Sequence, residues 1–166
     1  AYDRVRAGEE VTLSARDVIV SRFEVTGERG TESGRDLDGI VDCSSGTYIR
    51  ALGLDLGEDL SVGGHLSALR RTRVGPFSVT DAVGLDDLTN AVPLPPAQAA
   101  ALILPVLDAT ADEARDLRHG KRLIGQASRV SGALAAAIDP AGTLVGVVEK
   151  RGADLKSAMN MPESAR

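Results

Sequence analysis

Apolar and polar residues alternate with a period of two in two early segments of the chain, residues 17–26 and 36–43. This alternation is typical of β-strands, because successive strand side chains point to opposite faces of a sheet. Residues 27–35 between them are polar and rich in glycine. The pattern predicts a hairpin whose two strands are joined by a loose loop.

The next segment has an apolar period of about 3.6 residues, which predicts a helix entered through residues 44–47. Four residues form its apolar face: Ile49, Leu52, Leu56 and Leu60. Tyr48 and Arg50 then lie in the first turn. Gly53 and Gly57 each cost such a helix about 1 kcal/mol relative to alanine, so packing must stabilise it. A close approach by a neighbouring segment is one use for these glycines.

The middle of the chain predicts three short elements: a helix over residues 64–71, a strand over 73–77 and a helix over 80–88. Pro76 places the strand at an edge or an end of a sheet, because proline has no amide hydrogen to donate. From 89 to 105 several prolines forbid a regular element across their span, and we expect the domain boundary there.

The last part of the chain predicts a small β-rich domain of about 60 residues. Thr110 and Glu113 are spaced as a capping box for a helix that Gly120 ends. Strands are predicted over residues 134–138 and 143–149, on either side of an Asp-Pro-Ala-Gly turn.

The chain of 166 residues carries 19 basic and 24 acidic side chains, which argues against non-specific nucleic-acid binding through overall charge. The distribution changes this picture, because residues 61–80 hold Arg70, Arg71 and Arg73 and no carboxylate. An RNA partner would have to meet the chain there. The solitary Cys43 and two histidines indicate neither a disulfide nor a metal site, and no apolar run is long enough to span a bilayer.

The densest cluster of chemically useful residues lies within residues 42–52. A strand ends there in a turn of small residues, and the helix that follows presents a phenol, Tyr48, and a guanidinium, Arg50. The free amide groups and partial positive charge of a helix N-terminus suit an anionic partner. Arg50 would pair well with a carboxylate or a phosphate, although Asp55 or Glu58 could serve as a purely local partner.

The order Cys-Ser-x-Gly-Thr-Tyr-Ile-Arg, then Asp-Leu-Gly, then Leu-Arg-Arg after a Gly-Gly-His segment resembles the third conserved motif of TruB-type bacterial tRNA pseudouridine synthases. The match is dense over residues 42–77 and weaker over an Ala-Tyr-x-x-x-Arg-x-Gly pattern at residues 1–8. The resemblance implies an α+β fold. It places the C-terminal part of a mixed-sheet synthase domain at 1–95, a linker at 96–105 and a β-rich, PUA-like RNA-binding domain at 106–166.

Such an enzyme flips uridine 55 out of the T-loop of tRNA, and an aspartate attacks the nucleoside. The base is detached, rotated and re-attached through carbon 5 without a cofactor or a metal. By motif position, Tyr48 is implied to stack on the target base where carbon 5 loses its proton. Arg50 is implied to form an ion pair with the aspartate, and Leu69 to form an apolar wall of the pocket. RNA contacts are implied for four residues: His65, Arg70, Arg71 and Arg73.

The catalytic aspartate of the family lies in a Gly-x-Leu-Asp-Pro-type motif, and no acidic residue of this chain matches that motif. The chain alone is therefore expected to be inactive, and we interpret it as a truncated product or as part of a longer enzyme. Residues 1–8 favour this interpretation, because they resemble the end of an amphipathic helix without its beginning. The intact enzyme is expected to be a cytoplasmic monomer that acts on the T-arm of tRNA.

Two other functions stay open at this point. The segment could be a non-catalytic tRNA-binding or folding-helper module, or an unrelated β-rich scaffold, which a structure lacking a helix after Cys43 would support. A nucleophilic Cys43 paired with His65 is a weaker hypothesis, because no third orienting group is evident. The alternative for Tyr48 and Leu69 is ordinary core packing, and the arginines could form a solvated face.

Overall fold

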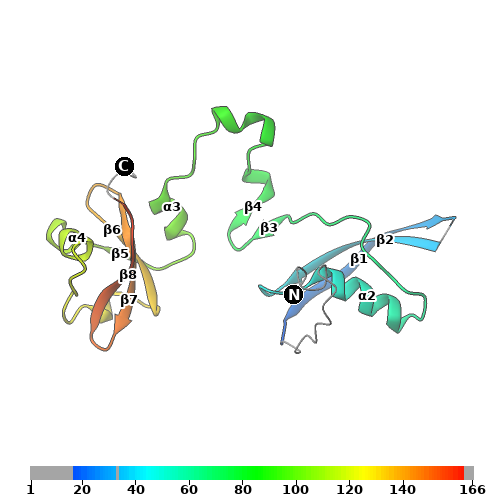
Figure 1. The fold of residues 1–166 in the computed structure, drawn as a ribbon, viewed down its shortest axis with the longest axis horizontal. Helices are drawn as coiled ribbons and strands as arrows, with labels where there is room; N and C mark the ends of the chain where they lie inside the picture. The colour runs from blue at the N-terminus through cyan, green and yellow to red at the C-terminus, as the bar shows by residue number, and fades with distance from the viewer. Residues whose placement is uncertain (1–16, 33, 163–166) are drawn as a thin grey trace, which may run out of the picture. The chain divides into compact units, whose positions relative to one another are not determined.

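The computed structural model describes residues 17–32 and 34–162 of the chain. It consists of two compact units, with the division between Leu69 and Arg70, and Figure 1 shows the elements of each. None of the helices within the described residues has the length and apolar character that a membrane span requires. The helix end expected at residues 1–8 lies outside the described residues.

The first unit contains an antiparallel ribbon of two strands, β1 (Val20–Thr31) and β2 (Gly34–Cys43), which confirms the predicted hairpin (Figure 1). Both faces of the ribbon are largely exposed, and Phe23 and Val25 keep 49% and 51% of their surface accessible. Within the described residues, the hydrogen-bonded ladder rather than a buried core holds these strands together.

The loose loop expected over residues 27–35 is wrong, because the strand ladder continues through most of this segment. Salt bridges support the ladder there: Arg29 pairs with Asp38 over 3.3 Å, and Arg35 pairs with Glu28. Cross-strand pairs of opposite charge stabilise a sheet as apolar pairs do.

Helix α2 (Ile49–Asp59) follows β2, as the apolar spacing predicts. Its apolar side chains are only half-buried, and Gly57 is the buried residue of the helix. The helix expected over residues 64–71 is wrong, since the chain is irregular there. The reason is local packing, because the backbone of Gly63 and Gly64 lies directly against α2 and does not continue into a second helix.

The second unit begins with a small hairpin formed by β3 (Arg73–Val74) and β4 (Phe77–Ser78). The single strand expected over residues 73–77 is thus two strands joined by a turn. Gly75 has a φ of 54°, in the left-handed region that glycine adopts readily, and this conformation reverses the chain.

Two 3₁₀ helices, η1 (Val79–Asp81) and η2 (Leu85–Asn90), replace the single helix expected over residues 80–88. Gly84 separates them with extended backbone angles, φ −63° and ψ 154°, which a continuous helix cannot include. The side chain of Ser78 accepts a hydrogen bond from the amide of Thr80 and caps the first of them.

A four-stranded sheet with the order β5-β6-β7-β8 forms the rest of the second unit (Figure 1). β5 is parallel to β6, and the other neighbours are antiparallel. β6 and β7 confirm the two strands predicted around the Asp-Pro-Ala-Gly turn. The elements of this part are α3 (Pro96–Ala101), β5 (Val106–Asp108), α4 (Ala111–Arg118), η3 (Ala127–Arg129), β6 (Leu134–Ile138), β7 (Leu144–Arg151) and β8 (Asp154–Asn160).

Two helices cover opposite faces of this sheet. Ala135 and Ala137 of β6 belong to the core that includes Leu117 of α4, whereas Ala136 packs with Ala97 of α3. Neighbouring residues of a strand point to opposite faces, so α4 and α3 lie on different sides of β6. Residues 96–105, expected as a linker, therefore include a helix that packs on the sheet, and the division into domains stays a prediction.

The capping box of α4 is confirmed. The hydroxyl of Thr110 accepts from the amide of Glu113 over 3.2 Å, and the Glu113 carboxylate accepts from the Thr110 amide over 2.8 Å. Burial raises the pKa of Glu113, but the hydrogen bond from Thr110 and the guanidinium of Arg129 outweigh this effect and lower the pKa. The start of α4 is therefore held by a carboxylate that stays charged.

Asp139 ties the end of α4 to the turn between β6 and β7. Its carboxylate accepts from Arg118 over 2.8 Å and from the amides of Ala141 and Thr143 over 3.0 and 2.9 Å. The hydrogen bond from Arg118 lowers the pKa of Asp139 more than burial raises it, and the two amides lower it further. This largely buried ion pair locks one helix to one hairpin.

Candidate functional site

The turn between β2 and α2 fixes the start of the helix that carries the candidate catalytic residues. Ser44 donates its amide to the carbonyl of Ile19 over 2.8 Å, and its hydroxyl accepts from the Ile19 amide over 3.0 Å. The hydroxyl of Thr47 donates to the Ser44 carbonyl over 2.9 Å. Gly46 has a φ of 85°, which the reversal of the chain requires. The turn is thus tied to the residue that precedes β1.

Tyr48 and Arg50 lie at the N-terminus of α2, where the motif places them. Tyr48 is the N-cap residue, in an extended conformation, and its carbonyl accepts the first helical hydrogen bonds. Its side chain is 55% exposed, and Arg50 is exposed as well. A phenol and a guanidinium thus lie together at one helix end. The roles of Tyr48 and Arg50 stay predictions.

A glycine contact fixes the segment that leads from α2 toward Leu69. The amides of Val62 and Gly63 donate to the carbonyl of Gly57 over 3.0 and 2.9 Å. A Cβ atom on Gly57 would lie 2.2 Å from the carbonyl carbon of Gly63, so only glycine permits this approach. Leu66 follows and lies over Gly53 of the same helix. The sequence predicted a close approach at these glycines, and the loop after the helix makes it.

His65 and Leu69 belong to the first unit, as Tyr48 and Arg50 do, whereas the three arginines belong to the second unit. Leu69 is 62% exposed in this chain, and His65 is exposed as well. The structure thus brings the candidate base-pocket residues into one unit. The arginines Arg70, Arg71 and Arg73 are all exposed at the start of the next unit.

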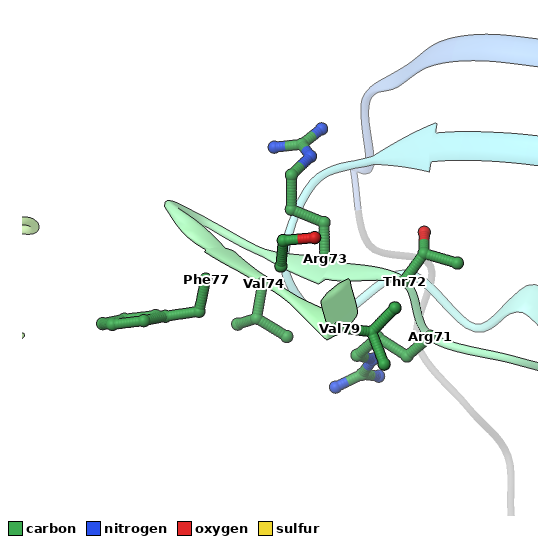
Figure 2. A pocket seen from close by; sticks show the side chains of 7 residues that line it. Arg71, Thr72, Arg73, Val74, Phe77 and Val79 are labelled. Atoms are coloured by element: carbon green, nitrogen blue, oxygen red, sulfur yellow. The ribbon is translucent and has the colours of Figure 1, made fainter. Parts of the chain in front are cut away.

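A hollow of about 220 Å³ lies on the β3–β4 hairpin (Figure 2). Its walls combine two arginines with apolar and hydroxyl side chains: Arg71, Thr72, Arg73, Val74, Phe77, Ser78 and Val79. The motif identified the arginines, but sequence reasoning missed Val74, Phe77 and Val79. Their alternation on either side of a Gly-Pro turn was the signal that could have found them.

The described residues do not include a candidate metal site. Among residues 17–32 and 34–162, no three His, Cys, Asp or Glu side chains gather closely enough to hold an ion. Cys43 is an exposed free thiol.

Two family models match the chain, and both describe C-terminal parts of one kind of enzyme. The model described as tRNA pseudouridylate synthase B C-terminal domain matches residues 50–110. The model described as tRNA pseudouridine synthase II, C terminal, matches residues 104–162. The two matches follow each other along the chain and cover both of its ordered units in part.

Curated relatives named tRNA pseudouridine synthase B match the chain closely. The relative from Leifsonia xyli subsp. xyli is 50% identical over 98% of this chain and 54% of its own length. The relative from Thermobifida fusca is 53% identical over 74% of this chain and 44% of its own length. The chain spans about half the length of the curated relatives it matches.

A solved structure has the same fold. It is described as an H/ACA RNP bound to a substrate RNA containing 2'-deoxyuridine, and it matches with a TM-score of 0.69 at 24% identity. The match covers 90% of this chain and 56% of that chain. The architecture is therefore the α+β fold that the motif implied. The chain belongs to the bacterial tRNA pseudouridine synthase B family and corresponds to its C-terminal part.

Proposed function

We propose that the intact protein converts uridine 55 in the T-loop of tRNA to pseudouridine. The observation that carries this proposal is the motif at residues 42–77, with Tyr48 and Arg50 at the exposed start of α2, in a chain that two synthase family models match. The resemblance to the family implies that the reaction needs neither a cofactor nor a metal. The relatives' printed name, tRNA pseudouridine synthase B, supports the same activity.

In this proposal each pocket residue has a separate role. Tyr48 stacks on the extruded uracil and lies beside carbon 5, which must lose its proton before the product forms. Leu69 packs against the base and excludes water. Arg50 forms an ion pair with the catalytic aspartate, which keeps that carboxylate ionised and oriented for attack. Base extrusion costs a few kcal/mol, and stacking on Tyr48 offsets part of this cost.

The aspartate itself must come from outside these 166 residues, because none of their acidic side chains occupies a Gly-x-Leu-Asp-Pro-type motif. We therefore expect the chain alone to be catalytically inactive. The intact enzyme is proposed to act as a monomer in the cytoplasm, where tRNA is modified. Its synthase part is proposed to extend to residue 95 and its PUA-like RNA-binding domain to begin near residue 106.

The tRNA contacts are proposed for His65, Arg70, Arg71 and Arg73. They lie in a stretch without carboxylates, so backbone phosphates meet no local negative charge there. A phosphate contact contributes to affinity through counterion release, and its loss lowers the salt dependence of binding. Each arginine-to-alanine variant should therefore reduce the slope of log K against log salt by about one.

Replacing Arg50 tests the proposal. In the intact protein, Arg50→Ala should lower the single-turnover rate of pseudouridine formation by roughly 100-fold, because the catalytic aspartate loses the cation that orients it and misplacement of a reacting group costs about that much. Arg50→Lys keeps the charge and should recover part of the rate. Arg115→Ala removes an exposed arginine of α4 and serves as the control. A wild-type rate in Arg50→Ala would refute the assigned role.

A second candidate is a non-catalytic tRNA-binding or folding-helper module. The observation in its favour is that the sheet at residues 106–160 has its own buried core, separate from the residues around Tyr48. Pseudouridine formation by the intact protein distinguishes the two candidates, because the arginines proposed to contact tRNA lie in this chain under either one. A helper module binds tRNA in a filter-binding assay with a salt slope of a few phosphates, but it forms no pseudouridine.

A further inference from the structure

The β3–β4 hairpin presents an apolar face beside a cation. Val74 and Phe77 are opposite each other in the antiparallel ladder, so their side chains project from the same face. Val79 is the first residue of η1 and also lines the hollow. Figure 2 shows the side chain of Arg71 beside Val79, whereas Arg73 projects from the other side of the hairpin. The hollow thus joins an apolar surface to two guanidinium groups, of which that of Arg71 lies on the side of Val79.

The charges around this hollow favour an anion. No carboxylate occurs in the sequence between Asp59 and Asp81. Within the described part of the chain, no carboxylate forms a salt bridge with Arg71. Arg73 differs, because one of its guanidinium N–H groups donates to the carbonyl of Gly75 over 3.3 Å. A guanidinium with no carboxylate near it is well suited to bind a phosphate.

The size of the hollow suits one residue of a longer polymer better than a whole small-molecule ligand. Its volume of about 220 Å³ is below the roughly 300–1,000 Å³ of sites that enclose a whole small ligand. Val74 and Phe77 remain 57% and 40% exposed, so an aromatic ring is accessible next to the guanidinium. Proteins that hold unpaired nucleotides use this combination, in which a base stacks on the ring and a cation meets the backbone.

We propose that the hairpin hollow binds one unpaired nucleotide of the RNA, other than the uridine that is isomerised. Its base lies on Phe77 and Val74, and its phosphate is bound by Arg71. This inference rests on the proposed function, since it takes RNA as the partner. It adds apolar contacts to a surface for which the motif implied phosphate contacts alone.

A double-mutant cycle with a T-arm RNA hairpin as the probe tests the inference in the intact protein. Phe77→Leu keeps the apolar bulk and removes the ring, so the affinity should fall by about fivefold or more with an unchanged salt slope. Arg71→Ala should weaken binding and reduce the salt slope by about one. The two changes should be non-additive, because both groups contact the same nucleotide.

Arg70→Ala is the matched comparison, since it removes the same charge from an exposed residue that does not line the hollow. Its effect should add to that of Phe77→Leu within about twofold. Phe77→Trp retains a ring and should bind as the wild type does, which separates stacking from loss of the hairpin. Leu85→Ala changes a residue that is 86% exposed and outside the hollow, and it should bind normally.

Wild-type affinity in Phe77→Leu, or a Phe77→Trp variant as weak as Phe77→Leu, would overturn the inference. Strict additivity of Phe77→Leu with Arg71→Ala would overturn it as well. Failure of the proposed function has a different signature. In that case the intact wild-type protein forms no pseudouridine, or Arg50→Ala leaves the rate unchanged, whatever the Phe77 variants do to binding.

Discussion

Replacing Gly57 with alanine tests whether α2 and the loop after it form one rigid body. A Cβ atom at this position would lie 2.2 Å from the carbonyl carbon of Gly63 and 2.3 Å from the amide nitrogen of Gly64. Both are backbone atoms, so no change of side-chain rotamer relieves the overlap. The loop must move away, and the hydrogen bonds from Val62 and Gly63 to the Gly57 carbonyl are then lost.

The expected change in the free energy that holds the loop against α2 is the sum of effects of opposite sign. Alanine stabilises a helix by about 1 kcal/mol relative to glycine. Overpacking a close contact costs about 1–3 kcal/mol, and each of the two lost backbone hydrogen bonds costs about 1 kcal/mol more. The free energy that holds the loop against the helix should therefore fall by roughly 2–4 kcal/mol.

Native-state hydrogen exchange at the amides of Val62 and Gly63 measures this change at the site itself, which matters because the two units need not unfold together. Gly53→Ala is the matched control. Its Cβ would meet only the end of the Leu66 side chain, at 3.1 Å, which can shift. Unchanged or increased protection of the two amides in Gly57→Ala would refute the reasoning.

Two further predictions concern the C-terminal domain. Thr110→Ala removes the hydroxyl that accepts from the Glu113 amide and should destabilise the domain by about 1 kcal/mol in urea unfolding, whereas Thr110→Ser should be nearly neutral. The pKa of Asp139 is lowered in the folded state, so the stability it contributes is complete above its unfolded pKa of about 3.9 and is lost as the pH falls through the folded pKa. Asp139→Asn should cost about 1–3 kcal/mol near neutral pH and should flatten the loss of stability below about pH 4. An acid profile identical to that of the wild type would contradict the role assigned to the Arg118 ion pair.

The sequence predicts those elements whose signal is local. The spacing of Ile49, Leu52 and Leu56 specifies α2, and the Thr110–Glu113 pair specifies the start of α4. Both signals depend only on residues within the element. For the same reason, the motif places Tyr48 and Arg50 at the start of α2 without any knowledge of the tertiary structure.

The errors arise where distant residues decide the conformation. The ribbon includes residues 27–31 and 34–35, where charged side chains pair across the strands, and alternation of apolar residues does not reveal such pairs. The segment 64–71 is irregular because it packs on glycines of another element. The hollow beside Arg71 was missed because Val74 and Phe77 become neighbours only once the hairpin turns at Gly75.

The central claim is that Tyr48 contacts the uridine that is isomerised. The most direct measurement is the single-turnover rate of pseudouridine formation on tRNA by the intact protein with Tyr48→Ala. A residue at the site of proton loss contributes roughly 100-fold or more to the rate, so the variant should be slower by at least that factor while it still binds tRNA. Conversion at the wild-type rate would contradict the claim.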